Sequence, residues 1–599
     1  MESVNSRQKE KNPLVVLLSY HWRFSKESRG KVFLYTFMFI CANLVDFFPP
    51  LIIAKILNVV QQSGITQDNY VGLLLWLGLF VLIEFSFWLF HGPARIIEMD
   101  VAFWNNAKYK KFLLDGILSL PASWHSSHHS GDTIDKVEKA TKALNDFSSH
   151  IFELIEVVMR FIGAYFALVY FNLNASYIVL LFSALTVFIV LKMDGIIIPR
   201  LKKLNKYQNS ISAKIFDTIS NISTVLILRI ERLVLRLIAK KIDEPFDYNR
   251  KTNQINELKW FFGAMFFVLM IFFVMGSYVL GAIKTNAVVL VGTLSVLFNY
   301  TNRIGSLFFR FMYRYGDFVK WRTNIANVEE ISDEFIIKPK QTKSSLKSNW
   351  QRIHVANLQF KYDDVNAKKL HLDNISFSLG RNERIAFIGA SGSGKTTALK
   401  IIRELYPVMQ MDMLVDGEVI TGGFSMISQS ISLIPQDPEI FSSTIKENIT
   451  LGLPVSKKKI KKYTDLAKFT EVVKRLPQGL ESSINERGVN LSGGEKQRLA
   501  LARGLLASED KQIMLLDEPT SSVDPKNELE IYENVFKIFS DKTIVSSIHR
   551  LHLLPLFDKI YLFHRGKIVD SGSYSELAKT SKLFRKMLDK YKHKVVSKK

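Results

Sequence analysis

Six long apolar stretches fill the first half of the chain and leave few folds open to it. They cover approximately residues 32–60, 70–89, 151–170, 177–198, 261–283 and 287–309. Each is close to the roughly 20 residues that an α-helix needs to cross the hydrocarbon core of a bilayer. Because a segment in lipid must satisfy its own backbone hydrogen bonds, we expect six transmembrane helices.

The rest of the chain has a different composition, which indicates a second kind of domain. From about residue 351 it reads as short strands and turns, so we expect a soluble α/β domain at 351–590. The transmembrane domain is expected at 31–332, a polar linker at 333–350 and a basic tail at 591–599. Residues 1–30 form the N-terminus, in which the apolar patch at 13–18 suits a helix lying along the membrane surface. The single cysteine, Cys41, rules out an internal disulfide and is expected to be buried.

The formal net charge of +23 is explained by membrane topology. The short loops at 61–69, 171–176 and 284–286 contain one basic residue, Lys284, whereas the long connections at 90–150 and 199–260 are rich in Lys and Arg. The positive-inside rule then places both termini and both long connections in the cytoplasm. We therefore set nucleic-acid binding aside.

The two long connections are each about 60 residues, enough for a helical hairpin that extends well beyond the bilayer at 1.5 Å per residue. We expect short crosswise helices at their tips, near 121–127 and 218–224. The alternative is that each connection is simply a soluble loop.

Charged residues inside the spans are costly and are functional candidates. Glu156 and Arg160 are four apart on one helix, so mutual neutralisation is the simplest interpretation. Asp46 and Glu84 have no partner evident from the sequence, and Pro49-Pro50 should kink the first span.

Two arginines of the last span, Arg303 and Arg310, are seven apart and share a helix face. They could line an internal cavity, which would suit an anionic amphiphile. The alternative is that their side chains extend towards the cytoplasmic surface.

A glycine-rich loop, Gly389-Ala390-Ser391-Gly392-Ser393-Gly394-Lys395-Thr396, follows the apolar run at 384–388. A strand that feeds glycines into a helix aims several backbone N–H groups at one point, where they can cradle phosphate oxygens. Lys395 adds a charge for the β- and γ-phosphates and Thr396 a hydroxyl for Mg²⁺. We count the loop and Thr397 as nucleotide-binding residues and expect ATP and Mg²⁺ as cofactors.

A second apolar run, at 513–516, ends in Asp517 and Glu518. An aspartate at the end of a buried strand can hold Mg²⁺ through water, because that ion keeps several waters and few protein ligands. Glu518 is placed to orient or deprotonate an attacking water. Without the phosphate loop, the pair could equally be a helix N-cap.

A third motif, at 491–498, places Ser492, Gly493 and Gly494 before a helical run. These residues make a second set of N–H groups that attract anions. Because one γ-phosphate does not need two such cradles from one subunit, the second set is expected to serve a nucleotide on a neighbouring copy.

In this order and spacing, the motifs closely resemble those of an ATP-binding cassette (ABC) transporter, specifically an exporter-type (type IV) half-transporter. The resemblance implies an α-helical membrane domain with long cytoplasmic extensions, followed by an α/β P-loop ABC ATPase domain. It implies that Tyr362 stacks on adenine, that Gln436 contacts Mg²⁺ and the attacking water, and that His549 reaches the γ-phosphate. The catalytic set is then Glu518, His549, Gln436 and Lys395, and the metal-binding set is Thr396, Gln436 and Asp517.

Three positions depart from the family pattern. Glu495 stands where Gln is commoner in the signature motif, Pro519 where many exporters have Ala, and Trp124-His125 where paired aromatics are frequent. The first two remove no group needed for hydrolysis.

By the same resemblance, two copies, or this chain and a homologous half-transporter, enclose two ATP–Mg²⁺ and export or flip an amphipathic substrate by alternating access. A lipid, drug, peptide or conjugate would fit, and the expected location is the plasma membrane of a bacterium. The alternatives are an ATP-gated channel or channel regulator, and a transporter of the same architecture that runs inward.

Overall fold

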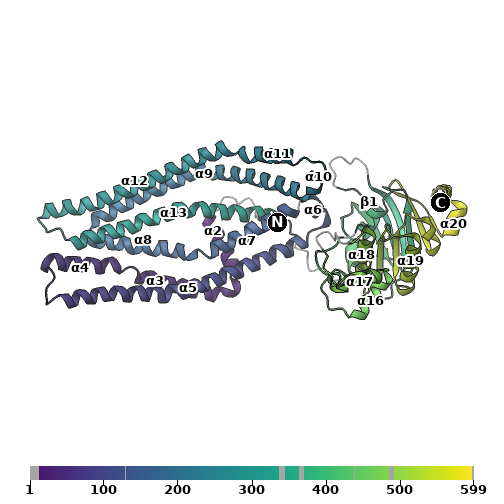
Figure 1. The fold of residues 1–599 in the computed structure, drawn as a ribbon, viewed down its shortest axis with the longest axis horizontal. Coiled ribbons are helices and arrows are strands. Elements are labelled where there is room, and N and C mark those ends of the chain that lie inside the picture. Colours follow the sequence, from purple (N-terminus) through teal and green to yellow (C-terminus); the bar gives the residue numbers. More distant parts are fainter. Residues whose placement is uncertain are drawn as a thin grey trace. The chain divides into compact units, whose positions relative to one another are not determined.

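The computed structural model describes residues 12–128, 130–335, 345–362, 370–437, 439–484 and 491–596. By its internal contacts the chain divides into two compact units. The first comprises Met1–Leu120 and Ser127–Ile336, and the second comprises Pro121–Ser126 and Ile337–Lys599. The first unit is built from helices and the second from two sheets with helices around them (Figure 1).

Long helices run through the first unit. Helix α9 packs along α12, α3 packs along α5, and α13 contacts α4, α7, α8 and α12. The helices of this unit are α2 (Pro13–Phe24), α3 (Arg29–Val45), α4 (Pro49–Ser63), α5 (Tyr70–Leu118), α7 (Ser130–Ser148), α8 (Ile151–Phe171), α9 (Leu173–Ser220), α10 (Ile222–Ile227), α11 (Glu231–Asp243), α12 (Phe246–Thr285) and α13 (Val291–Ser332), and the short helix α6 (Ala122–Ser127) falls almost wholly in the second unit.

Five helical segments of the described residues are long and apolar enough to cross a membrane. They carry the first five spans predicted from the sequence. The sixth predicted span, 287–309, lies mostly on α13, which does not meet the same measure of length and hydropathy. Asn299, Asn302 and Arg303 lower its apolar character, although Tyr300 and Ile304 are fully buried in the bundle. The sixth span therefore remains a prediction.

The first predicted span is broken rather than kinked. Helix α3 ends at Val45 and α4 begins at Pro49, with the two prolines in the first turn of α4, where a missing N–H costs nothing. Carbonyls in the break need donors. The Tyr300 hydroxyl donates to Phe47 O at 2.7 Å, and Arg303 Nη1 donates to Asp46 O at 2.8 Å. Helix α13 thus satisfies the backbone of the broken helix.

Short helices occupy both predicted tips, but the second is displaced. At the first tip lies α6, whose segment Pro121–Ser126 belongs to the second unit. At the second, α9 continues to Ser220 and the short helix is α10, so the position predicted at 218–224 was wrong by several residues. The Thr218 hydroxyl donates to Lys214 O at 2.9 Å within α9, so this residue extends the helix instead of ending it.

Helix α2 covers the predicted interfacial segment and extends it to Phe24. Its His21 is 3 % exposed and lies in a cluster of polar side chains. Nδ1 lies 2.9 Å from Ser148 Oγ, and Nε2 lies 3.2 Å from the Tyr35 hydroxyl. Burial lowers the pKa of His21 to about 4, so the imidazole is neutral at pH 7. Cys41, expected to be buried, is only partly so.

The second unit contains a six-stranded sheet in the order β10-β9-β3-β8-β7-β6 and a four-stranded sheet in the order β2-β1-β4-β5. Strand β3 pairs in parallel with β8 and β9, and β7 pairs in parallel with β6 and β8. The carboxyl ends of these strands therefore meet at one edge, where ligands bind in open α/β sheets. The strands are β1 (Arg352–Phe360), β2 (Leu372–Gly380), β3 (Arg384–Gly389), β4 (Gln410–Val415), β5 (Glu418–Val419), β6 (Ile431–Ile434), β7 (Ile513–Asp517), β8 (Thr543–Ser547), β9 (Lys559–His564) and β10 (Lys567–Gly572).

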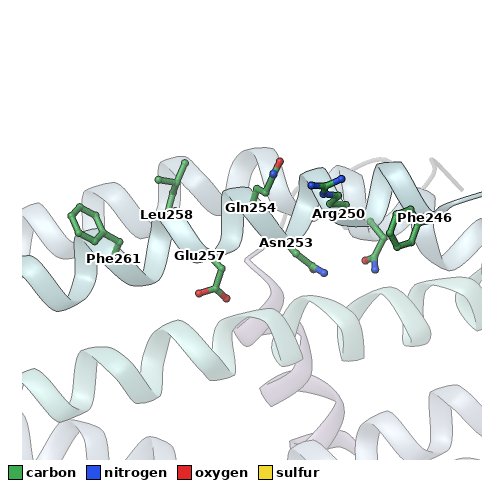
Figure 2. A pocket seen from close by; sticks show the side chains of 8 residues that line it. Phe246, Arg250, Asn253, Gln254, Glu257, Leu258 and Phe261 are labelled. Atoms are coloured by element: carbon green, nitrogen blue, oxygen red, sulfur yellow. The ribbon is translucent and has the colours of Figure 1, made fainter.

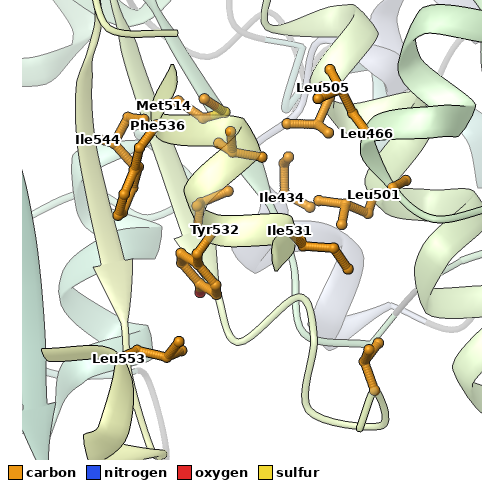
Figure 3. Close-up of a cluster of buried hydrophobic side chains, with 14 of the residues drawn as sticks. Ile434, Leu466, Leu501, Leu505, Met514, Ile531, Tyr532, Phe536, Ile544 and Leu553 are labelled. Carbon is orange, nitrogen blue, oxygen red and sulfur yellow. The ribbon is translucent and has the colours of Figure 1, made fainter. Parts of the chain in front are cut away.

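A large apolar core fixes this edge from beneath. It packs side chains of β6, β7 and β8 against the helices α18 and α19. Figure 3 shows Ile434 and Met514 from the sheet beside Leu501 and Ile531 from these helices. The helices of the unit are α14 (Lys395–Ile402), α15 (Ile445–Thr450), α16 (Lys457–Leu466), α17 (Thr470–Arg475), α18 (Gly493–Ala507), α19 (Pro525–Ile538), α20 (Tyr574–Thr580) and α21 (Lys582–Val596).

Candidate nucleotide site

The glycine-rich loop connects the end of β3 to the start of α14. Gly389 and Gly394 have φ of 147° and 111°, which side chains rarely adopt. A Cβ on Gly389 would also lie 2.3 Å from Phe563 O. The loop is tied to the β9–β10 turn, because Gly566 N donates to Ser393 O at 3.0 Å. These positions require glycine, and the curled loop that results fits a phosphate cradle.

Two side chains of the loop are buried and chemically suited to phosphate. Lys395 is 5 % exposed, and its Nζ donates to Gly389 O at 2.9 Å and to Ala390 O at 3.3 Å. Burial lowers the pKa of Lys395, which the nearby carboxylates of Glu518 and Asp517 oppose. Ser393 is 4 % exposed, and its Oγ has no hydrogen-bond partner in the described part of the chain. An unsatisfied buried hydroxyl is costly unless a ligand pairs with it. Ala390, Ser391 and Gly392 form the exposed rim of the loop.

Asp517, the last residue of β7, meets the start of α14. Thr396 Oγ1 donates to Asp517 Oδ1 at 3.0 Å, which joins residues 121 positions apart. Burial raises the pKa of Asp517, against the hydrogen bond from Thr396. A hydroxyl and a carboxylate side by side are the oxygen donors that Mg²⁺ takes beside phosphate. The residues present therefore fit the predicted metal site.

Glu518 lies at the centre of the predicted catalytic residues. Its Oε1 is 3.2 Å from His549 Nε2 and accepts from the Ser547 hydroxyl at 3.4 Å, while its Oε2 is 3.5 Å from Gln436 Nε2. Burial raises the pKa of Glu518, and Lys395 opposes that rise. Burial and then the charge of Lys395 lower the pKa of His549. A carboxylate with a raised pKa beside a neutral imidazole is suited to accept a proton from water.

Tyr362, predicted to contact adenine, packs in an aromatic cluster beside the loop. Its ring centroid lies 4.7 Å from that of Phe360 and 5.1 Å from that of Tyr406. Its hydroxyl is 3.4 Å from Thr397 Oγ1, so the ring stands next to the first turn of α14.

The signature residues form the N-terminus of α18. Ser492 Oγ accepts from Glu495 N at 3.3 Å, and Glu495 Oε2 accepts from Ser492 N at 2.8 Å, which is a capping box. Arg475 forms an ion pair with Glu495. Glu495, a departure from the family pattern, therefore caps the start of α18.

Gln497 was not singled out from the sequence, yet it connects two loops of the site. Its Nε2 donates to Ser521 Oγ at 2.7 Å and to Gln436 O at 3.3 Å, and its Oε1 accepts from Ser522 N at 2.8 Å. The loop of Gln436 and the loop after Glu518 are thereby fixed to α18. The one sequence signal for a role of Gln497 in the site is its position inside the motif at 491–498.

Arg550 was also missed as a site residue. Its Nη1 donates to Val523 O at 2.7 Å and to Glu528 Oε2 at 3.0 Å, and its Nη2 donates to Ser521 O at 2.9 Å. The Thr520 hydroxyl donates to the other Glu528 oxygen at 2.7 Å. Because the Glu528 side chain is only 5 % exposed, this pair fastens the loop after Glu518 to α19.

Comparison with known proteins agrees with this geometry. The family model of the ABC transporter transmembrane region matches residues 32–304, and the ABC transporter model matches residues 372–521. Together they cover well over half of the chain. The chain belongs to the ABC transporter family. It is thus an integral membrane protein with an ATP-binding domain, an ATP hydrolase coupled to transport, as the sequence predicted.

Similar proteins span almost the whole chain. The putative multidrug export ATP-binding/permease proteins of Staphylococcus aureus strains NCTC 8325 and COL are each 26 % identical over 571 residues, covering 90 % of this chain and 94 % of theirs. The solved structure of a bacterial Atm1-family ABC exporter with ATP bound matches with a TM-score of 0.84 and 22 % identity, over 94 % of this chain and 99 % of that one. This likeness confirms the predicted exporter fold.

Proposed function

We propose that this ABC transporter exports an amphipathic substrate as a dimer, with a second copy of itself or with a homologous half-transporter. The observation that carries the catalytic part is the set of Gln436, Ser547 and His549 side chains around the Glu518 carboxylate, beside the phosphate loop. Export is supported by the exporter fold and by the relatives, which are putative multidrug export proteins.

Each predicted residue has a role that its position supports. Tyr362 stacks on the base, the N–H groups of the loop and Lys395 hold the phosphates, and Thr396, Asp517 and Gln436 hold Mg²⁺. When bound, Mg²⁺ neutralises charge on the phosphates. Glu518 orients the attacking water and takes its proton, and His549 supports the γ-phosphate.

A dimer is supported by surfaces that one copy leaves open. Ser492, Gly493 and Gly494 present anion-seeking N–H groups at the start of α18, while the same chain's phosphate loop forms its own cradle. At the tip formed by α10, Leu226, Ile227 and Leu228 are 55 %, 79 % and 60 % exposed, although the basic connections place this tip in the cytoplasm. Exposed apolar groups of this kind mark an interface.

A further open surface lies along α12. A hollow of about 1060 Å³ is lined entirely by that one helix, and Figure 2 shows its polar side chains, among them Asn253, Gln254 and Glu257, along the same stretch. This stretch of α12 precedes the predicted span at 261–283, so we infer that a second copy packs over it on the cytoplasmic side.

ATP binding changes the relative populations of two membrane states, and hydrolysis resets them. The intact catalytic set favours a transporter over an ATP-gated channel, which can tolerate a decayed site. The distribution of Lys and Arg supports a cytoplasmic ATPase domain, and the bacterial relatives support a plasma membrane. A lipid, drug, peptide or conjugate remains a suitable substrate.

The proposal is tested first at Glu518. In the reconstituted full-length protein, Glu518→Gln is expected to bind ATP normally and to lose about 100-fold or more of its hydrolysis, the range for loss of a general base. Glu533→Gln, an exposed change on α19, is the matched control and should retain full turnover. Hydrolysis at the normal rate by the Glu518 variant would refute the catalytic assignment.

The dimer is tested by complementation. Lys395→Ala and Ser492→Arg copies are each expected to be inactive as homodimers, whereas a mixed dimer contains one complete pocket and recovers hydrolysis. If mixing restores nothing although mixed dimers form, the shared pocket is wrong.

A further inference from the structure

A charged pocket lies inside the helical unit, among the predicted transmembrane spans. It has a volume of about 240 Å³ and is formed by α3, α8 and α13. We call it the arginine pocket. Its wall includes Arg160, Arg303 and Asn43, and also Leu44, Ile162 and Phe166. Among the described residues, the two arginines are the only charged ones that line it.

The arginines of the pocket share the carboxylates that neutralise them. Asp46 Oδ2 lies 3.1 Å from both Arg160 Nη2 and Arg303 Nη1, so one carboxylate oxygen serves two guanidinium groups. Glu156 is likewise shared, at 2.8 Å from Arg160 and 2.6 Å from Arg310. Each of these two carboxylates is thus divided between two guanidinium groups, so an acidic ligand can compete with them for the arginines of the pocket. A charge within the bilayer is costly, and one that is kept is functional by default.

Hydrogen-bonding capacity also remains in the wall. Arg160 Nε and Asn43 Oδ1 are buried and have no partner among the described residues. Asn43 is 8 % exposed and anchored through its Nδ2, which donates to Phe39 O at 2.9 Å. Unused buried polar atoms beside a cavity are places where a ligand can form hydrogen bonds.

The mouth of the arginine pocket is apolar. Leu44, Ile162 and Phe166 are 53 %, 45 % and 65 % exposed, respectively. A ligand that enters between them would therefore lay an alkyl or aromatic part on these side chains while its head reaches the guanidinium groups. Guanidinium groups pair in a planar, bidentate manner with carboxylate and phosphate.

We propose that the arginine pocket binds an amphiphile with an acidic headgroup, a carboxylate or a phosphate, and that this is the class of substrate exported. That the bound amphiphile is the exported substrate rests on the proposed export function. Binding of the amphiphile to the pocket does not depend on ATP. It selects one chemistry among the lipids, drugs, peptides and conjugates that the fold admits.

The test uses photolabelling of the full-length protein in nanodiscs of zwitterionic phosphatidylcholine, without nucleotide. The probe is dodecyl phosphate carrying a diazirine on its chain. We expect label on peptides of α3 and α8, displaced by unlabelled dodecyl phosphate and by dodecanoate. Dodecyltrimethylammonium and inorganic phosphate should each need at least tenfold higher concentration. If the cation displaces the probe equally well, the pocket does not select a negative headgroup. If inorganic phosphate displaces it equally well, the pocket binds an anion and not an amphiphile. Label confined to other helices places the ligand outside the pocket.

Two variants with opposite expected effects guard against misfolding. Arg303→Gln should raise the half-saturating probe concentration about tenfold, and Asp46→Asn, which removes the competing carboxylate, should lower it by a similar factor. Arg314→Gln is the matched control, because Arg314 pairs with Glu153 and Asp317 and does not line the pocket. If both pocket variants behave like this control, the inference is overturned.

The two proposals can fail separately. Absent or unspecific labelling in a preparation that hydrolyses ATP through Glu518 overturns the substrate class and leaves ATP-driven export standing. Specific labelling in a preparation that does not hydrolyse ATP supports binding of the acidic amphiphile and overturns ATP-driven export.

Discussion

Replacing Arg550 with alanine should loosen the loop that follows the catalytic carboxylate. Two donated hydrogen bonds, to Ser521 O and Val523 O, disappear, and Glu528 loses its ion pair while its side chain stays 5 % exposed. Hydrogen bonds from a charged donor contribute about 1.5–3 kcal/mol each, which we reduce to about 1 kcal/mol each because the Arg550 side chain is 30 % exposed. Breaking a buried ion pair costs about 3–5 kcal/mol, which we reduce to about 1–2 kcal/mol because the Arg550 side chain is 30 % exposed. The local loss is therefore about 3 kcal/mol.

Hydrogen exchange measured by mass spectrometry on the full-length protein reads this loss directly. A decrease of about 3 kcal/mol in the opening free energy accelerates exchange roughly 100-fold in peptides that cover residues 519–524. Arg550→Lys retains the charge but not the fork of donors, so an intermediate acceleration is expected. The rate of ATP hydrolysis should fall more in Arg550→Ala than in Arg550→Lys, because this loop follows Glu518 directly.

Arg585→Ala, an exposed change on α21, is the control and should leave exchange in residues 519–524 unaltered. Glu528→Ala combined with Arg550→Ala should cost less than the two single changes added together, since each single change already removes the ion pair between them. Exchange within threefold of the unaltered protein in Arg550→Ala, or strict additivity in the double variant, would refute the reasoning.

Three further predictions concern the membrane unit, each read from thermal unfolding of the purified protein. The pKa of His21 is about 4 in the folded protein and about 6.5 in the unfolded chain, so roughly 3 kcal/mol of stability is present above pH 6.5 and is lost as the pH falls towards 4. His21→Asn should flatten this dependence of stability on pH. If the dependence is unchanged in the variant, His21 is not its cause. Gly292→Ala should destabilise by about 1–3 kcal/mol, since its Cβ would lie 2.1 Å from Ala54 O, whereas Gly281→Ala has free space and should be neutral or stabilising; equal effects would mean that α4 and α13 yield at no cost. Lys259→Met leaves the buried Asp194 without its ion-pair partner at 2.9 Å and should lower stability by on the order of 3 kcal/mol. Adding Asp194→Leu in the same chain should restore most of that stability. If it does not, the unpaired Asp194 is not the cause of the loss.

The motifs of the nucleotide site were readable from the sequence because each is contiguous. A strand followed by a glycine-rich loop forms the cradle by local geometry alone, so the residues from Gly389 to Thr396 could be found without a structure. The exporter fold followed from the order of these motifs and the apolar stretches, and the comparisons confirm it. The roles of the individual site residues remain predictions.

Contacts between distant positions left no comparable signal. The pairing of Glu156 with Arg160 was predicted and is confirmed, because four residues are one turn of a helix. Asp46, for which no partner was evident, is held by Arg303, 257 positions away. Nothing local marks such a contact, since it arises only when α13 packs against the broken first span.

Helix ends were predicted less well than helices. The second tip was placed too early because Thr218 and neighbouring polar residues look like a turn. In the structure the Thr218 hydroxyl bonds within its own helix, and Asn221 Nδ2 donates to Asp217 O at 2.9 Å where α9 ends. Serine, threonine and asparagine support either outcome, and tertiary packing decides.

The modest hydropathy of α13 has a consequence for how the protein is made. Arg303, Arg310 and Arg314 leave the ribosome after their acidic partners Asp46, Glu153 and Glu156, which lie in segments synthesised some 150 residues or more earlier. Those carboxylates must already sit in the bilayer, or at the insertion machinery, when the arginines arrive. If α13 forms the predicted sixth span, its insertion would therefore be assisted by helices that are already in place.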